Sequence, residues 1–482
     1  MEKVKIIAKN TFILIATKAL CNVLYFITFI YIARHLGSVD FGKLSFALAF
    51  TLILGVFCDF GIKTWMIREV VRNKTQLDLY VFNILFIKSL LAFGTFILIS
   101  FIIHSLNYSK DVITLVYFLG GAVIINSFTQ TGNFLFRAFE RMEFEAIVNL
   151  FGRAIFLIFT LIAVSMELNI FYISGSFLVT NLLACSLCWF IFLSRFTLIR
   201  FTVNIDLSKK IIKASIPFVL MEIFIEIYLR ANAVMLSLMK GDKYVGYYNT
   251  AYQFLEGILK MLPLSLMGAL FPALAYAFIS SEKEFKLLFT KGLRVLIMIG
   301  IPLTVGIYIL ADKFIFFFYG EEYVPSIFVL KVLSLALPFI FINSLLGTTL
   351  CTINRQILWT TACGVGMVIN ILLNFILIPL FAERGAAIAT VVTEGTLFFL
   401  ALFFLYKFIP IPVEYAFLLK TGITSVLMGL LISILKQFNL FVIILAGMTF
   451  YFSFLFIIDG FSQGKKVLSK GYLLGKLKQP FL

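Results

Sequence analysis

The chain has 482 residues, of which 62% are hydrophobic, 17% aromatic and only 13% charged, and its mean hydropathy is +1.06. A soluble protein is closer to half apolar and a quarter charged. So many apolar side chains cannot fit inside one compact core, which excludes a soluble domain and makes lipid the solvent. The net charge of +16 does not indicate nucleic acid as a partner, because Lys and Arg stand at the ends of apolar runs.

Runs of about 20 apolar residues are long enough to cross a bilayer as helices, and the chain has fourteen of them. The predicted transmembrane helices cover, in chain order, residues 11–33, 44–62, 80–103, 112–134, 146–166, 170–193, 212–238, 247–279, 289–311, 326–351, 357–380, 385–406, 414–435 and 439–460. Most Lys and Arg residues gather on the side of the N-terminus, and such an excess marks the cytoplasmic side. We expect a multi-pass protein of the cytoplasmic (inner or plasma) membrane with both termini in the cytoplasm.

A glycine-punctuated segment occurs twice in the chain. GSVDFGKLSFALAF (37–50) joins the first two predicted helices, and GDKYVGYYNTAYQF (241–254) joins the seventh and eighth. Six predicted helices separate the copies, so both halves enter the membrane in the same sense, as in a parallel repeat. We therefore expect an all-α integral membrane protein with two parallel six-helix bundles, and its expected parts are an N-terminal lobe (1–200), a C-terminal lobe (201–410), and two additional helices with a basic cytoplasmic tail (411–482).

Apart from the residues assigned to helix ends, eleven ionisable residues fall inside the predicted helices, where an unpaired charge costs about 2.5–3.5 kcal/mol. They therefore have to pair, reach an interface or line water. Several recur with polar neighbours at helical spacing, as Lys18, Asn22 and Tyr25 do on the first helix, and so make one polar stripe on an apolar helix. Local pairs such as Glu226 with Arg230, or hydrogen bonds between helices, stay open as the alternative explanation of the stripes.

From the stripes we predict a polar, partly cationic cavity between the two bundles. The residues expected to hold an anionic headgroup are Lys18, Asn22, Tyr25, Lys88, Arg153, Arg230 and Lys260. The carboxylates expected to serve coupling or selectivity are Asp59, Glu222, Glu226 and Glu256. The other polar residues expected in the cavity are Asn126, Asn149, Asn232 and Gln253.

The six cysteines all lie within apolar runs, and we expect them to act as small hydrophobic residues. Cys185 and Cys188 have the spacing of a metal or redox motif, but nothing nearby supplies further ligands. We expect no metal site, no cofactor and no catalytic residue.

Several blocks, in order along nearly the whole chain, resemble one family of membrane proteins. They are YIARHLGSVDFGKLSFALAF (31–50), DFGI (59–62), REVVR (68–72), FRAFERMEF (136–144), VMLSLMKGDKYVGYYNTAYQ (234–253), ALFPAL (269–274), NRQILWTTACGVGMVINILLNFILIP (354–379) and GAAIATVVTE (385–394). These blocks are similar to the polysaccharide-biosynthesis, or O-antigen repeat-unit, flippases of the multidrug/oligosaccharidyl-lipid/polysaccharide exporter superfamily.

The resemblance implies a V-shaped protein of two six-helix lobes and two extra helices. It also implies that a polyprenyl-diphosphate-linked oligosaccharide moves from the cytoplasmic to the outer leaflet by alternating access. A diphosphate-sugar headgroup does not cross about 30 Å of hydrocarbon unaided. A polar cleft lets the headgroup pass while the lipid tail stays in the bilayer.

One position departs from the pattern of this family. Where its members often carry Asp in a Y-x-R-I-D-x-x-M-L block, this chain has YLRANAVML, with Asn232 at the acidic position. A coupling role of that Asp is then lost or moved to Glu222 or Glu226. The sequence leaves H⁺ and Na⁺ open as coupling ions, and enzymes of glycan assembly open as further partners.

Other functions of polytopic proteins fit less well. A cation-coupled exporter of drugs or other small molecules needs a cavity dominated by carboxylates, and six cations against five anions within the helices disfavour it. A membrane glycan polymerase or glycosyltransferase needs an ordered catalytic loop, but the outer connections reach only roughly a dozen residues. A major-facilitator transporter would carry a basic loop after its second helix. We predict a transporter, not an enzyme, whose partners are the bilayer and a lipid-linked oligosaccharide.

Overall fold

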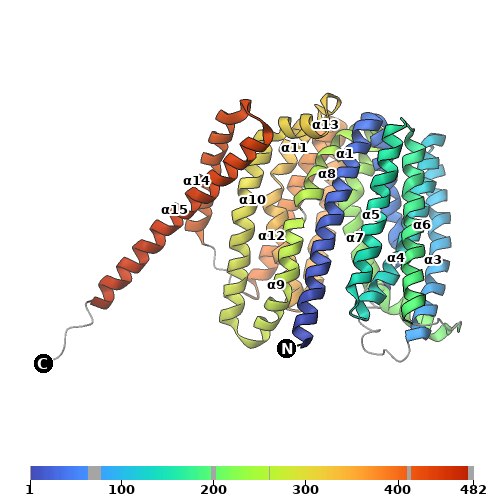
Figure 1. Ribbon diagram of the computed structural model, residues 1–482, viewed down its shortest axis with the longest axis horizontal. Helices are drawn as coiled ribbons and strands as arrows, with labels where there is room; N and C mark the ends of the chain where they lie inside the picture. Colours follow the sequence, from blue (N-terminus) through green and yellow to red (C-terminus); the bar gives the residue numbers. More distant parts are fainter. Residues whose placement is uncertain (1, 63–76, 197–201, 260, 410–413, 476–482) are drawn as a thin grey trace.

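The computed structural model describes residues 2–62, 77–196, 202–259, 261–409 and 414–475, and all regular structure in these ranges is helical (Figure 1). The α-helices are α1 (Glu2–Asp59), α3 (Leu77–Ser105), α4 (Lys110–Ala138), α5 (Met142–Ser165), α6 (Ile170–Arg195), α7 (Ile205–Lys240), α8 (Asp242–Leu259), α9 (Met261–Ser280), α10 (Glu282–Phe318), α11 (Ser326–Ser334), α12 (Leu337–Thr352), α13 (Gln356–Tyr406), α14 (Tyr415–Ile434) and α15 (Leu440–Gly475). Two short 3-10 helices are η2 (Glu321–Tyr323) and η3 (Leu435–Gln437).

These helices confirm the expected all-helical, multi-pass membrane protein. Nine described helices are long and apolar enough to cross a membrane, or ten if the bent pair α11 and α12 counts as one span. Two of the nine join pairs of predicted helices across a break in the backbone, which lies at Gly37 in α1 and at Ala382 in α13. The count of fourteen spans, the two-bundle arrangement and the lobe boundaries stay predictions.

The span predicted over 326–351 is bent in the structure, where α11 and α12 meet at an angle of 45°. Pro338 lies in the first turn of α12. It has no N–H to donate to the carbonyl four residues earlier, and its ring crowds that turn, so a straight helix cannot continue. Other helices begin at side-chain caps. Asn204 accepts the N–H of Leu207 at the start of α7.

The helices pack in two sets that meet along α1. In the first set, α4, α5 and α6 pack on one another, and α1 packs on α4 and α5. In the second, α7 and α12 pack on α13, and α10 packs on α12. The sets meet where α1 packs on α7 and α8, while α14 packs on α10 and α15 extends away from the body (Figure 1).

The break in α1 and the connection between α7 and α8 have the same backbone conformation. Gly37 has φ 70° and ψ 176°, and Gly241 has φ 97° and ψ 170°. Residues with a Cβ rarely adopt such positive φ values, whereas glycine adopts them without steric cost. The repeated glycines of the sequence therefore make two equivalent turns.

The two turns also pack directly on each other. A Cβ on Gly42 would lie 1.8 Å from the carbonyl oxygen of Asp242, and a Cβ on Gly246 would lie 2.0 Å from that of Ser38. Ser38 precedes Gly42 by four residues, as Asp242 precedes Gly246, so the two approaches are related by the repeat. We call this reciprocal packing of Gly42 and Gly246 on the two carbonyls the glycine contact. It joins the two sets of helices by backbone alone.

A buried ion pair joins helices within the first set. Lys88 of α3 is 1% exposed, and its Nζ lies 2.6 Å from Oδ1 of Asp59 in α1. The same ammonium donates to the carbonyl oxygen of Ser127 at 2.9 Å and to Oγ1 of Thr131 at 2.7 Å, both in α4. Three helices thus share one buried cation whose acceptors are all protein atoms.

We predict that Gly42→Ala or Gly246→Ala destabilises the protein. The added methyl group would overlap a backbone carbonyl oxygen, and overpacking of this kind costs about 1–3 kcal/mol. The measurement is the midpoint of thermal unfolding in detergent. Gly94→Ala is the matched control, because a Cβ there meets nothing within 4 Å. Equal midpoints for all three variants would contradict the close packing of the two turns.

We predict that Asp59→Asn lowers the free energy of unfolding by about 3–5 kcal/mol, because it leaves the ammonium of Lys88 buried with neutral acceptors only. The double variant Asp59→Asn with Lys88→Met should recover most of this loss, since it removes the buried charge as well. Unfolding midpoints of the two variants are compared. A double variant no more stable than Asp59→Asn would refute the structural role of the pair.

Candidate functional site

A polar cavity of about 400 Å³ lies among the middle turns of the two sets of helices. Helices α1, α4, α5 and α6 line it from the first set, and α7 and α8 from the second. The lining contains eight of the residues predicted from the polar stripes, namely Asn22, Tyr25, Asn126, Asn149, Arg153, Arg230, Gln253 and Glu256. Stripes on different helices therefore face one shared space.

The cavity carries charges of both signs. The guanidinium of Arg153 in α5 lies over the ring of Tyr25 in α1, 4.6 Å from its centroid, and this cation–π contact holds the charge at the wall. Arg230 of α7 has its Nε 3.7 Å from Oε2 of Glu226, which lies one helical turn earlier and does not line the cavity. Glu256 of α8 contributes a carboxylate to the lining. Two guanidinium groups and one carboxylate therefore set the charge of this space.

Most of the other polar side chains in the lining are carboxamides, and Thr129 and Thr180 add hydroxyl groups. Asn133 donates to Oδ1 of Asn149 at 3.1 Å, which fixes the Asn149 side chain against the neighbouring helix. Asn181 of α6 also lines the cavity and donates to the carbonyl oxygen of Phe177 at 2.8 Å. Asn181 belongs to no polar stripe, because the residues three and four positions away from it are apolar. Its only signal in the sequence is that of an Asn within an apolar run.

Other predicted residues lie away from the cavity. Lys88 and Asp59 bind each other and do not line it. Lys18 is exposed on α1, one turn before Asn22, and Glu222 is half-buried on α7; both are absent from the lining. Lys260 lies outside the described residues.

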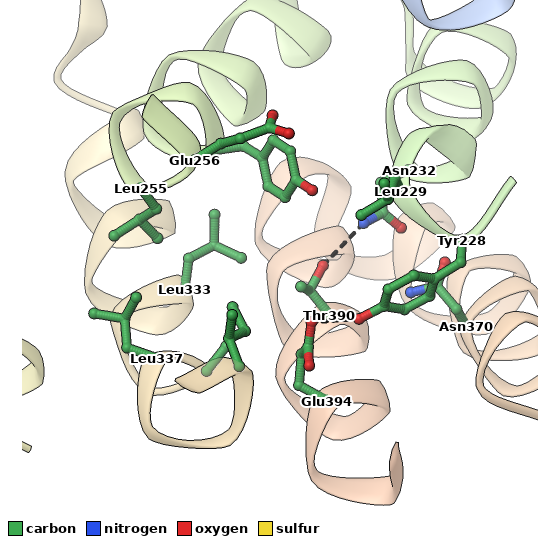
Figure 2. Close-up of a pocket in the computed structure, with 13 residues that line it drawn as sticks. Tyr228, Leu229, Asn232, Leu255, Glu256, Leu333, Leu337, Asn370, Thr390 and Glu394 are labelled. Atoms are coloured by element: carbon green, nitrogen blue, oxygen red, sulfur yellow. Dashed lines mark hydrogen bonds between the residues drawn. The ribbon is translucent and has the colours of Figure 1, made fainter. Parts of the chain in front are cut away.

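Asn232 lies in a separate network of hydrogen bonds within the second set of helices. It donates to the hydroxyl oxygen of Tyr248 at 2.6 Å and to Oγ1 of Thr390 at 2.9 Å, and its Oδ1 accepts from Asn374 at 2.6 Å. The network borders a pocket of about 40 Å³ between α7, α8 and α11 to α13. Figure 2 shows its polar side chains from α7 and α13 on one side and Leu255, Leu333 and Leu337 on the other.

Two carboxylates share this pocket with Asn232, namely Glu256 of α8, which also lines the larger cavity, and Glu394 of α13 (Figure 2). Tyr228 donates its hydroxyl proton to Oε1 of Glu394, and Asn343 donates to Oε2 at 2.9 Å. Glu222 and Glu226, the two residues expected to replace the missing acidic group at position 232, do not line the pocket. Glu394 reaches this pocket because α13 packs on α7 and α12 in the fold. No local sequence pattern indicates that Glu394 belongs to the pocket. Across the described ranges, no three His, Cys, Asp or Glu side chains are placed to hold a metal ion.

Curated relatives and a family model match much of the chain. The model, described as polysaccharide biosynthesis protein, matches residues 7–278. The probable low-salt glycan biosynthesis flippase Agl15 of Haloferax volcanii is 22% identical over 228 residues, which are 46% of this chain and 48% of that protein. The putative O-antigen transporter of Escherichia coli strain K12 is 24% identical over 385 residues, which are 76% and 89% of the two proteins. The chain thus spans about half of the first relative and most of the second.

Solved structures share the fold. The lipid II flippase MurJ in an inward closed conformation aligns with a TM-score of 0.80 at 16% identity, over 92% of this chain and 98% of that one. An inward-facing multidrug resistance transporter of the MATE family, in the MOP superfamily, aligns with a TM-score of 0.63 at 15% identity, over 80% and 93%. At these identities the likeness concerns the fold. Because the family model covers more than half of the chain, this protein belongs to the polysaccharide biosynthesis protein family, a family of membrane transporters and not of enzymes.

Proposed function

We propose that the protein moves a polyprenyl-diphosphate-linked oligosaccharide from the cytoplasmic to the outer leaflet. The observation that carries this proposal is the cavity, in which Arg153, Arg230 and several carboxamides meet between two sets of otherwise apolar helices. The names of three similar proteins support it, since they are a glycan biosynthesis flippase, an O-antigen transporter and a lipid II flippase.

The proposed site divides the substrate by polarity. The isoprenoid tail stays in the bilayer, where it needs no protein partner, and only the headgroup enters the cavity. Guanidinium groups bind phosphate oxygens with paired, charge-assisted hydrogen bonds. We assign the diphosphate to Arg153 and Arg230, which line the cavity from the two different sets of helices.

Alternating access follows if the lobes 1–200 and 201–410 tilt against each other within the fourteen-span arrangement, with helices of 411–482 at the side. The glycine contact closes one end of the interface between the sets. Next to it, Tyr323 of η2 donates to the carbonyl oxygen of Ala33 at 2.7 Å and packs on Phe41, so the proposed opening of this end breaks these contacts as well. The proposed orientation, with cytoplasmic termini, places this contact on the outer side. Glu256 and Glu226 are proposed for selectivity or for coupling to H⁺ or Na⁺.

We predict that Arg153→Gln and Arg230→Gln each slow transport of the lipid at least about 10-fold, because a charge-assisted hydrogen bond contributes about 1.5–3 kcal/mol. The measurement uses proteoliposomes with a fluorescent polyprenyl-diphosphate disaccharide and follows its accessibility to an impermeant glycosidase. Lys110→Gln is the matched control, since Lys110 is exposed at the start of α4 and outside the cavity.

Two results would contradict the proposal. Wild-type rates in both arginine variants would remove the assigned diphosphate site. Transport of an organic cation, with no movement of the lipid, would instead favour the multidrug exporter, whose fold the chain also shares.

A further inference from the structure

We propose that the glycan carried by this protein is built from uncharged sugars, and that a wall of carboxamides in the cavity recognises their hydroxyl groups. This inference rests on the proposed function and specifies its substrate class. It is carried by the composition of the cavity lining, in which six carboxamide side chains accompany only two cationic ones.

The carboxamide wall comes from three neighbouring helices of the first set. Asn126 and Gln130 lie one turn apart on α4, Asn149 lies on α5, and Asn181 lies on α6. A carboxamide has two N–H donors and one carbonyl acceptor, and it carries no charge. It therefore matches a sugar hydroxyl, which donates and accepts, and burying it under a neutral ligand leaves no ion without a partner.

Hydrogen bonds within the protein fix what this wall presents. The oxygen of Asn149 accepts from Asn133 at 3.1 Å, so the amide N–H groups of Asn149 are the donors left for a ligand. Asn181 uses one N–H on the carbonyl oxygen of Phe177, and its side-chain oxygen is the acceptor left. Donors and acceptors thus stand on adjacent helices, the arrangement that neighbouring hydroxyl groups on one sugar ring require.

Two other helices repeat this chemistry. Asn22 of α1 and Gln253 of α8 line the cavity, and within the described part of the chain their side-chain amides make no hydrogen bond to protein. The rings of Phe156 in α5 and Phe177 in α6 also line the cavity, with centroids 4.1 Å apart. Aromatic faces suit the apolar C–H faces of pyranose rings.

The cations in the lining are too few to serve an acidic glycan as well as the diphosphate. Arg153 and Arg230 are its only cationic side chains among the described residues, and Glu226 already lies 3.7 Å from Arg230. Once the diphosphate occupies both guanidinium groups, a uronic acid in the cavity would leave water without a cationic partner. The cavity therefore selects against a second anionic group on the headgroup.

The test compares two lipids that differ in one group. Full-length protein in proteoliposomes receives a polyprenyl diphosphate carrying a glucosyl-glucose disaccharide, or the same lipid with glucuronic acid as the terminal sugar. Transport is followed by accessibility to impermeant periodate. We expect the neutral lipid to move at least about 10-fold faster, which corresponds to 1.4 kcal/mol.

A variant with an added charge tests whether the preference for the neutral lipid depends on the carboxamide wall. Gln130→Lys places an ammonium among the carboxamides and should shift the ratio of rates at least about 5-fold toward the acidic lipid. Ser109→Lys adds the same charge to α4 at an exposed N-cap position that makes no side-chain cap hydrogen bond, and it should leave the ratio unchanged. Unfolding midpoints confirm that both variants are folded.

The outcomes separate this inference from the function on which it rests. Equal rates for the two lipids, a faster acidic lipid, or a ratio that Gln130→Lys does not move would overturn the inference and leave the flippase function standing. Transport of neither lipid by the folded wild-type protein would overturn the flippase function itself, and the inference with it.

Discussion

An unpaired charge is costly in hydrocarbon. The positions of the charged residues in this protein follow from that cost. The structure shows two solutions side by side. Lys88 and Asp59 neutralise each other in a buried ion pair that joins three helices. Arg153, Arg230 and Glu256 instead border a cavity large enough for water and ligand. The first solution joins three helices, and the second leaves charged groups around a space between the two sets of helices.

Both sets of helices contribute to the walls of this cavity. Arg153 comes from one set of helices and Arg230 from the other, so a ligand bound to both spans the interface between the sets. At one end that interface is closed by the glycine contact, which depends on the absence of two Cβ atoms. A Cβ at either glycine would overlap a backbone carbonyl oxygen of the other turn, so glycine at these matched positions lets the two turns pack directly on each other.

Much of the cavity was predictable from spacing alone, because polar residues at i, i+4 and i+7 on an apolar helix face one direction. That rule found Asn22, Asn149 and Arg153, but it could not find the lone Asn181. Nor could it tell that Lys88 has Asp59 as its partner, since the two lie on different helices and only packing brings them together. The bend between α11 and α12 lies at Pro338, whose missing N–H is a constraint that the sequence itself displays.

The most direct test of this account is a structure of the full-length protein bound to a polyprenyl-diphosphate oligosaccharide in lipid nanodiscs. The account predicts the diphosphate within hydrogen-bonding distance of the guanidinium groups of Arg153 and Arg230, with the sugars against the carboxamides of α4, α5 and α6 and the isoprenoid tail in the bilayer. A headgroup bound elsewhere, with the cavity filled by closed packing of the two sets of helices, would contradict it.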